Sequence, residues 1–288
     1  IRKLLDEYGA ASVGEMGETH HAIRMMGEYT APGRLHQCYS FELMGYDFDA
    51  GFFRDRVEGF FKGAPDGWPM WAFSNHDVVR HATRWAKHGD SVADVAKQAA
   101  SLLLSFEGSI CLWQGEELGQ TDTPLEFEEL TDPQGIVFWP EPIGRDNTRT
   151  PMVWDASPNA GFTTGKPWLP VKPEQAARNV AAQDGAQGSV LEHYRAALAF
   201  RKASEALRDG KTRFLDLHEP VLGFIRGEGD GALLCLFNLS SVALSVTVAG
   251  VEAPTGPSLH TVLQGDRLTL GPNAAAFLPV NGTVAVQD

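Results

Sequence analysis

The chain has 288 residues, a mass of 31.3 kDa and a formal charge of −13, with 43% hydrophobic and 21% charged residues. This composition is near the average for globular proteins and excludes a disordered chain, a collagen and a coiled coil. No basic footprint for nucleic acid is present, and no apolar run reaches the ~18 residues of a membrane-spanning helix, so neither partner is expected. The length suggests about two domains.

The residues that commonly bind metals form no convincing set. The cysteines lie far apart in apolar stretches, which argues against a disulfide scaffold or a cysteine metal site: Cys38, Cys111 and Cys235. His20 and His21 with Glu18 are another candidate set, but adjacent histidines point in different directions on a helix. We therefore expect no metal and no cofactor.

The first part of the chain alternates short apolar runs with helical patterns. Helices are predicted over residues 2–8, 20–29, 50–62, 78–87 and 92–106. Strands are predicted over residues 11–14, 37–41, 69–74 and 110–113. Strands that alternate with helices of this length indicate parallel β-α units.

The segment from about 121 to 170 differs from the rest. It is rich in proline and aromatic residues and carries few periodic patterns. A loop of this length in a compact protein is usually functional, and its aromatic residues argue against disorder. One more amphipathic helix is predicted over residues 190–202.

The last part of the chain reads as closely spaced β-strands separated by turns. They are predicted over residues 213–217, 221–226, 232–238, 244–249, 261–262, 268–270 and 274–280. This spacing indicates a small antiparallel β-sandwich. We place the domain boundary so that residues 1–205 form an α/β domain and residues 206–288 the sandwich.

Glu15 is the first candidate for chemistry, because it follows a short predicted strand in the segment Val13-Gly14-Glu15-Met16. In parallel β/α barrels the active site is built at the carboxyl ends of the strands. For a single Glu, a solvated loop residue is the more common alternative.

His76 and Asp77 are the second candidates, in the segment Ser74-Asn75-His76-Asp77 directly after another predicted strand. Asp77 is also placed to cap the helix predicted over residues 78–87. His76 is alternatively a core histidine.

Arg145 and Arg149 are the third candidates, in the segment from Gly144 to Asp155. Two arginines four residues apart in an aromatic loop can clamp hydroxyls or a carboxylate. The alternative is a surface loop whose arginines pair with Asp146 and Asp155.

Taken together, these segments resemble glycoside hydrolase family 13, in its α-glucosidase and oligo-1,6-glucosidase branch. Val13-Gly14-Glu15 and Ser74-Asn75-His76-Asp77 are similar to two of the family's catalytic segments, and 113–119 (WQGEELG) is similar to its eighth-strand motif. The segments 144–155 and 166–171 are also typical of the branch. The motifs occur in the family's order across nearly the whole chain.

The resemblance implies roles for individual residues. Glu15 corresponds to the acid/base, and Asp77 to the acid that grips sugar hydroxyls and stabilises the transition state. His76, Arg149 and Arg145 correspond to groups that bind the sugar. Phe41, after the second predicted strand, is a candidate stacking wall for the leaving group, with a core phenylalanine as the alternative. The implied substrate is an α-glucoside oligosaccharide or sucrose.

One departure from the family pattern concerns the nucleophile. The family carries its nucleophilic Asp on a segment earlier than the acid/base, and the only Asp before Glu15 is Asp6, in a helical pattern. We therefore expect an α/β fold that is the C-terminal half of a (β/α)₈ TIM barrel, strands five to eight, followed by the β-sandwich. We also expect the chain, which starts at Ile1, to need the missing N-terminal half of the same barrel and to be inactive alone.

Two alternatives stay open. A sucrose isomerase or transglucosylase of the same family would use the same residues. A non-catalytic member, similar to the heavy chains of amino-acid transporters, would act as a partner protein, but such proteins have typically lost catalytic residues that stand here.

Overall fold

The computed structural model describes residues 1–17, 20–229 and 231–288 and divides into two compact units. The first unit holds residues 1–72, 101–111 and 197–288, and the second holds residues 73–100 and 112–196. This division does not follow the expected boundary at 205, because residues 197–288 group with the early strands. The two expected domains stay a prediction. Glu18 of the possible metal set lies outside the described residues.

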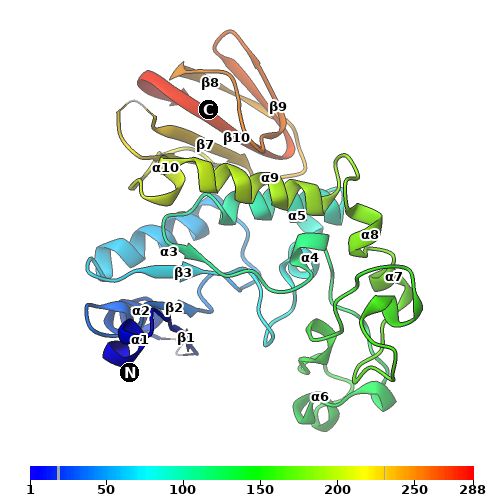
Figure 1. Ribbon diagram of the computed structural model, residues 1–288. Helices are drawn as coiled ribbons and strands as arrows, with labels where there is room; N and C mark the ends of the chain where they lie inside the picture. The colour runs from blue at the N-terminus through cyan, green and yellow to red at the C-terminus, as the bar shows by residue number, and fades with distance from the viewer. Residues whose placement is uncertain (18–19, 230) are drawn as a thin grey trace. The chain divides into compact units, whose positions relative to one another are not determined.

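A four-stranded parallel sheet organises the early part of the first unit (Figure 1). Its order follows the chain: β1 (Val13–Met16), β2 (Gln37–Ser40), β3 (Pro69–Trp71) and β4 (Ser109–Ile110). Helix α1 (Arg2–Glu7) precedes β1, α2 (Ala22–Thr30) follows it and α3 (Ala50–Gly63) follows β2, and two more helices, α4 (His81–Arg84) and α5 (Val92–Leu103), come between β3 and β4 in the chain. The predicted alternation of strands and helices is therefore confirmed for this segment.

Helix α3 shows how the sequence specifies this layer. Asp49 caps its first turn by accepting a hydrogen bond from the amide of Phe52 at 2.7 Å. Phe53, Val57 and Phe60 recur at helical spacing and are fully buried. Gly27 of α2 allows close packing there, because a Cβ at that position would lie 2.1 Å from the Cβ of Ala64.

A second, six-stranded sheet also lies in the first unit. Its strands are β5 (Thr212–Phe214), β6 (Val221–Arg226), β7 (Leu233–Asn238), β8 (Leu244–Val251), β9 (Leu259–Gln264) and β10 (Arg267–Gln287). The order is β5-β6-β7-β10-β8, with β9 paired to β10. The strands predicted over 268–270 and 274–280 are parts of the single strand β10, whose pairing with β8 shifts register repeatedly. Leucine, valine and alanine side chains from β6, β7, β8 and β10 form its core.

Arg226 ties this sheet to the segment before β4. Its side chain is fully buried, and it donates hydrogen bonds to the carbonyls of Ser105, Leu207 and Gly210. Burial lowers the pKa of this guanidinium to about 10. Hydrogen bonds to these carbonyls therefore replace the hydration that the guanidinium loses on burial.

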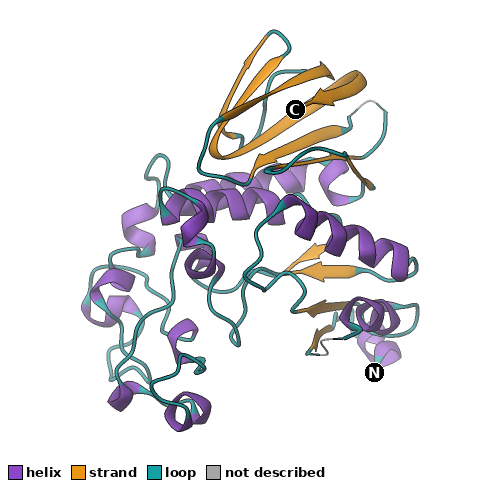
Figure 2. Cartoon of the chain, turned by 180° about the vertical axis from the view of Figure 1, so that it is seen from behind, coloured by secondary structure: helices purple, strands orange, loops and turns teal. Residues whose placement is uncertain are grey.

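The second unit consists mostly of loops and short helices (Figure 2). Its helices of one turn or slightly more are α4 (His81–Arg84), α6 (Pro133–Val137), α7 (Pro173–Ala176) and α8 (Val180–Gln183). Helices α5 (Val92–Leu103) and α9 (Val190–Ala203) cross the unit boundary, and α10 (Glu205–Arg208) follows α9. Short 3₁₀ segments join these helices at residues 86–88, 116–118, 127–129, 146–148 and 158–161.

The helix predicted over residues 78–87 is wrong in extent, since α4 begins only at His81. The reason is that Arg80 has an extended backbone, with ψ at 140°, which a helix through this residue cannot accommodate. Asp122 accepts from Arg80 at 2.8 Å and Ser74 accepts from His81 at 2.9 Å. Asp77 therefore does not cap this helix, whose N-cap is Arg80.

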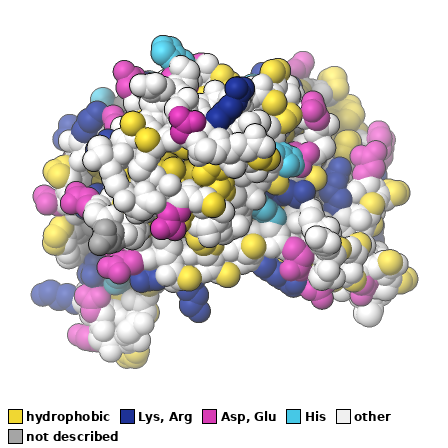
Figure 3. Space-filling model, turned by 90° about the horizontal axis from the view of Figure 1, so that it is seen from above, with side chains coloured by type: hydrophobic (Ala, Val, Ile, Leu, Met, Phe, Trp, Pro, Cys, Tyr) yellow, Lys and Arg dark blue, Asp and Glu magenta, His cyan; other side chains and the backbone are white. Residues whose placement is uncertain are grey.

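Charged side chains of both signs are interspersed on the face drawn in Figure 3. Among the described helices, none combines the length and apolar character needed to cross a membrane.

We predict that replacing Arg226 destabilises the protein strongly. Arg226→Met leaves three carbonyls without their charged donor, and each such bond contributes about 1.5–3 kcal/mol. Thermal unfolding measures the loss. Arg213→Met on the neighbouring strand β5 is the control, because Arg213 is exposed. Equal melting temperatures for the two variants would contradict the assignment.

Candidate active site

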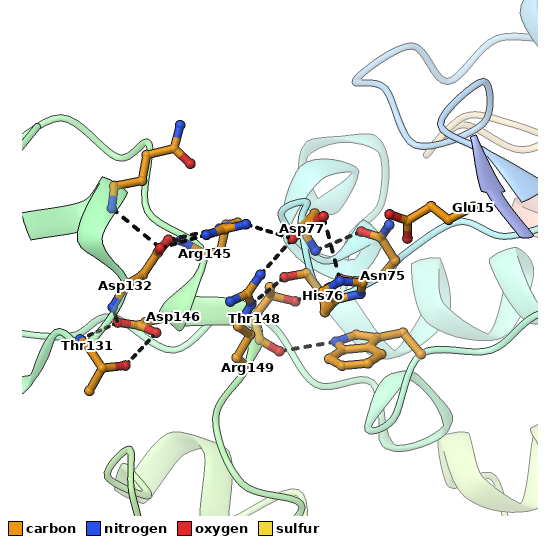
Figure 4. A network of polar contacts seen from close by, with 12 residues as sticks. Glu15, Asn75, His76, Asp77, Thr131, Asp132, Arg145, Asp146, Thr148 and Arg149 are labelled. Atoms are coloured by element: carbon orange, nitrogen blue, oxygen red, sulfur yellow. Dashed lines mark hydrogen bonds and ion pairs between the residues drawn. The ribbon is translucent and has the colours of Figure 1, made fainter. Parts of the chain in front are cut away.

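Asp77 lies at the centre of a polar network in the second unit (Figure 4). It follows β3 through the segment 72–76, and the side chain of Asn75 accepts a hydrogen bond from its amide at 2.9 Å. This turn fixes the backbone and leaves 26% of the Asp77 side chain exposed. The carboxylate is thus held in place and still open to a ligand.

Arg149 is the tightest partner of Asp77. Its Nη2 donates to Oδ1 of Asp77 at 2.6 Å, and its Nε donates to the carbonyl of His76 at 2.7 Å. One guanidinium thereby fixes both the carboxylate and the backbone before it. Nη1 of Arg145 approaches the same Oδ1 at 3.3 Å. The two predicted arginines therefore meet the predicted acid, in place of the surface pairing with Asp146 and Asp155.

Asp132 is the main hydrogen-bond partner of Arg145. Its carboxylate accepts from Nε of Arg145 at 3.0 Å, from Nη2 at 2.8 Å and from the Arg145 amide at 2.9 Å. Only 1% of the Asp132 side chain is exposed. The guanidinium holds the pKa of Asp132 well below its usual value, and the hydrogen bonds to Asp132 raise that of Arg145.

Asp146 joins the segment at residues 131–132 to the segment that carries Arg145. It accepts hydrogen bonds from the amides of Thr131 and Asp132 at 2.6 and 2.7 Å and from the Thr131 hydroxyl at 3.0 Å. Asp132 is not among the site residues predicted from the sequence. Its available signal was the Asp-Pro pair at 132–133, which is typical of a helix start.

His76 is half-exposed, so the alternative of a buried core histidine does not hold. Its Nε2 lies 3.7 Å from Oδ2 of Asp77, and its ring packs against Trp113 with centroids 5.9 Å apart. Trp113 donates to the carbonyl of Thr148 at 3.1 Å, which links the motif at 113–119 to the segment that carries Arg145 and Arg149. The imidazole and Oδ2 thus present polar atoms that neither arginine contacts in the described hydrogen bonds.

Glu15 and Phe41 lie in the first unit. Glu15 is an exposed residue of β1, and its carboxylate accepts a hydrogen bond from the hydroxyl of Tyr39, its register partner on β2. Phe41 follows β2 directly and is half-buried. The convergence of Glu15 and Asp77 on one sugar stays a prediction.

A cluster of buried titratable side chains supports the site within the second unit. Arg80 donates to the carbonyls of Gln114 and Thr148 at 2.7 and 2.8 Å. Oε2 of Glu116 lies 3.8 Å from Nδ1 of His81, and both side chains are 1% exposed. Burial raises the pKa of Glu116 to about 8 and lowers that of His81 to about 3, so the pair is neutral near pH 7.

Comparison with known proteins identifies the family. The model of the alpha-amylase catalytic domain matches residues 11–210, which is more than half of the chain. The chain belongs to the alpha-amylase family. The predicted membership of glycoside hydrolase family 13 is therefore confirmed, and with it the TIM-barrel fold class.

Relatives within the alpha-amylase family act on glucosides. A probable alpha-glucosidase of Rhizobium meliloti is 46% identical over 84% of this chain and 45% of its own length. An oligo-1,6-glucosidase of Heyndrickxia coagulans is 30% identical over 85% of this chain and 50% of its own. The structure of an alpha-glucosyl transfer enzyme, XgtA, matches with a TM-score of 0.89 at 43% identity, over 100% of this chain and 53% of that one. The chain thus spans about half the length of the relatives it matches.

We predict that Glu116 makes stability fall as the pH rises from about 4.5 to about 8. An unfolded carboxyl loses its proton near 4.5, whereas the folded one keeps it until about 8. Between these values the folded state binds more protons, so the free energy of unfolding falls by up to about 1.4 kcal/mol per pH unit as pH rises. Glu116→Gln mimics the neutral form and removes this contribution. Melting temperatures between pH 5 and 9 measure it, and a constant difference between variant and wild type would contradict the assignment.

Proposed function

We propose that this chain is part of a retaining, exo-acting α-glucosidase that cleaves α-glucosidic bonds in maltose-like oligosaccharides or sucrose. The observation that carries the proposal is the state of Asp77. One of its oxygens is held by Arg149 and Arg145, whereas Oδ2 faces only the half-exposed His76 among its described polar contacts. A carboxylate held in this way can accept hydrogen bonds from sugar hydroxyls and stabilise developing positive charge.

The proposed mechanism assigns proton transfer to Glu15. A retaining glycosidase needs two carboxyl groups: one attacks the anomeric carbon, and the other protonates the leaving oxygen and later deprotonates water. Glu15 serves as that second group, with Asp77 stabilising the oxocarbenium-like transition state. The nucleophile belongs to the N-terminal half of the barrel, and this chain supplies strands five to eight as β1–β4.

Transglucosylation is a second candidate for the same site. It is favoured by the likeness to the alpha-glucosyl transfer enzyme at 43% identity. Both reactions pass through the same glucosyl-enzyme intermediate and differ in whether water or a sugar hydroxyl accepts the glucosyl group. Chromatography of products made from maltose separates them: glucose alone indicates hydrolysis, and new oligosaccharides indicate transfer.

We predict large losses of turnover when either acid is made neutral in the complete protein. Glu15→Gln removes the proton donor and Asp77→Asn removes the charge beside the reacting ring, and general acid catalysis alone supplies about 10²–10⁴-fold. The measurement is the rate of p-nitrophenyl α-glucoside hydrolysis. The control is Glu58→Gln on α3, whose exposed pair with Lys62 joins residues one helical turn apart. Full activity in Glu15→Gln or Asp77→Asn would show that its role is misassigned.

We predict that residues 1–288 alone do not hydrolyse p-nitrophenyl α-glucoside. Without the nucleophile no glucosyl-enzyme forms, and β1 and β4 expose strand edges that invite aggregation. Joining the chain to the segment encoded upstream of it should restore both activity and solubility. Turnover by the chain alone would overturn the assignment of the missing nucleophile.

A further inference from the structure

Arg145 lies between two carboxylates and is shared unequally by them. Two of its nitrogens contact Asp132, at 2.8 and 3.0 Å, whereas a single one reaches Asp77, at 3.3 Å (Figure 4). A paired contact of a guanidinium with a carboxylate is the stronger geometry. The position of Arg145 is therefore set by Asp132, and its contact with Asp77 is secondary.

We propose that Asp132 is a positioning residue that holds Arg145 back from Asp77 and so keeps Oδ2 of Asp77 available to substrate. The inference rests on the proposed function, in which Asp77 accepts hydrogen bonds from sugar hydroxyls. Asp132 does not itself touch Asp77 or the sugar; it acts only through Arg145.

The short distance to Asp77 explains why such restraint is needed. Arg145 needs no backbone movement to make a full ion pair with Asp77, because 3.3 Å already separates the nearest atoms and 35% of its side chain is exposed. Released from Asp132, it can turn both nitrogens onto Asp77. With Arg149 already at 2.6 Å from Oδ1, the second guanidinium would then occupy Oδ2. The sugar would have to displace it.

The burial of Asp132 supports a holding role. Its carboxylate is almost inaccessible to solvent, and its hydrogen bonds to the side chain and amide of Arg145 fix that residue at two points. Its own amide is held by Asp146 at 2.7 Å. A buried carboxylate that is fixed on both sides keeps its geometry better than an exposed surface pair does.

The test compares Asp132→Asn with the wild type in the complete protein. Asparagine keeps the oxygen that accepts from the amide of Gln134 and loses the charge that holds Arg145. If Arg145 blocks Asp77 in most molecules, the apparent affinity for maltose falls in proportion to the fraction in which Asp77 stays free. We expect KM for maltose to rise about 10-fold, with kcat changed less than 3-fold.

A second substitution separates this effect from loss of loop structure. In an Arg145→Gln background no guanidinium remains to block Asp77, so Asp132→Asn should then leave KM within about 2-fold. The matched control is Asp146→Asn, which removes a buried acid from the same loop whose hydrogen bonds go to Thr131 and to the Asp132 amide. Any rise in KM that it causes should persist in the Arg145→Gln background. An equal rise from Asp132→Asn in both backgrounds overturns the proposal.

Arg145→Lys tests the same idea if Asp132→Asn does not fold. A lysine cannot span both oxygens of Asp132. Its ammonium should move to Asp77 and raise KM, and an unchanged KM would count against the proposal.

A crystal structure of the Asp132→Asn variant provides a readout that is independent of activity. We expect Arg145 in contact with both oxygens of Asp77. This outcome in a protein without glucosidase activity would refute the proposed function and keep the positioning role. Arg145 in its wild-type place would refute the positioning role alone.

Discussion

The pairing of one carboxylate, Asp77, with the guanidinium of Arg149 is the interaction on which the rest of the candidate site depends. Arg149 fixes the carboxylate and the preceding carbonyl together, so the loop after β3 has one conformation in which it presents polar atoms. Because Arg149 comes from a segment more than seventy residues later in the chain, the long aromatic loop must fold back for the site to exist at all. The loop is therefore part of the site and not merely a cover over it.

Two further acids make this folding possible. Asp146 binds the amides at 131 and 132, and Asp132 binds the side chain and amide of Arg145, so the loop is closed by hydrogen bonds between its own two ends. Both acids are buried, and buried carboxylates are stable as charges only where donors surround them. The cost of burying them is offset by seven hydrogen bonds, three donated to Asp146 and four to Asp132. The result is a rigid frame built almost without regular secondary structure.

The buried cluster around Arg80 avoids the cost of burying charge in a different way. Arg80 is bonded to carbonyls on the two segments it joins, whereas His81 and Glu116 avoid charge altogether because their pKa values are shifted in opposite directions by burial. The charge of Arg80 is thus held by carbonyls, whereas His81 and Glu116 are both neutral near pH 7.

The sequence by itself determined the order of strands and helices in the parallel sheet, the strand-rich C-terminal part and the identity of the family. These features are local: hydrophobic periodicity, turn residues and short motifs lie within a few residues of one another and can be read without the fold. It also identified Asp77, Arg145 and Arg149 as candidates, since their motifs are contiguous.

Only the tertiary structure decided how these candidates are joined. The role of Asp132 could not be predicted from the sequence, because an Asp before a proline indicates a helix start wherever it occurs. No local pattern shows that this carboxylate binds the guanidinium of Arg145, thirteen residues later. The extent of the helix after Asp77 was missed for the same reason, since the Arg80 amide is bonded to the distant side chain of Asp122 and Arg80 has an extended backbone. In both cases a long-range hydrogen bond to a buried group outweighs the local preference of the backbone.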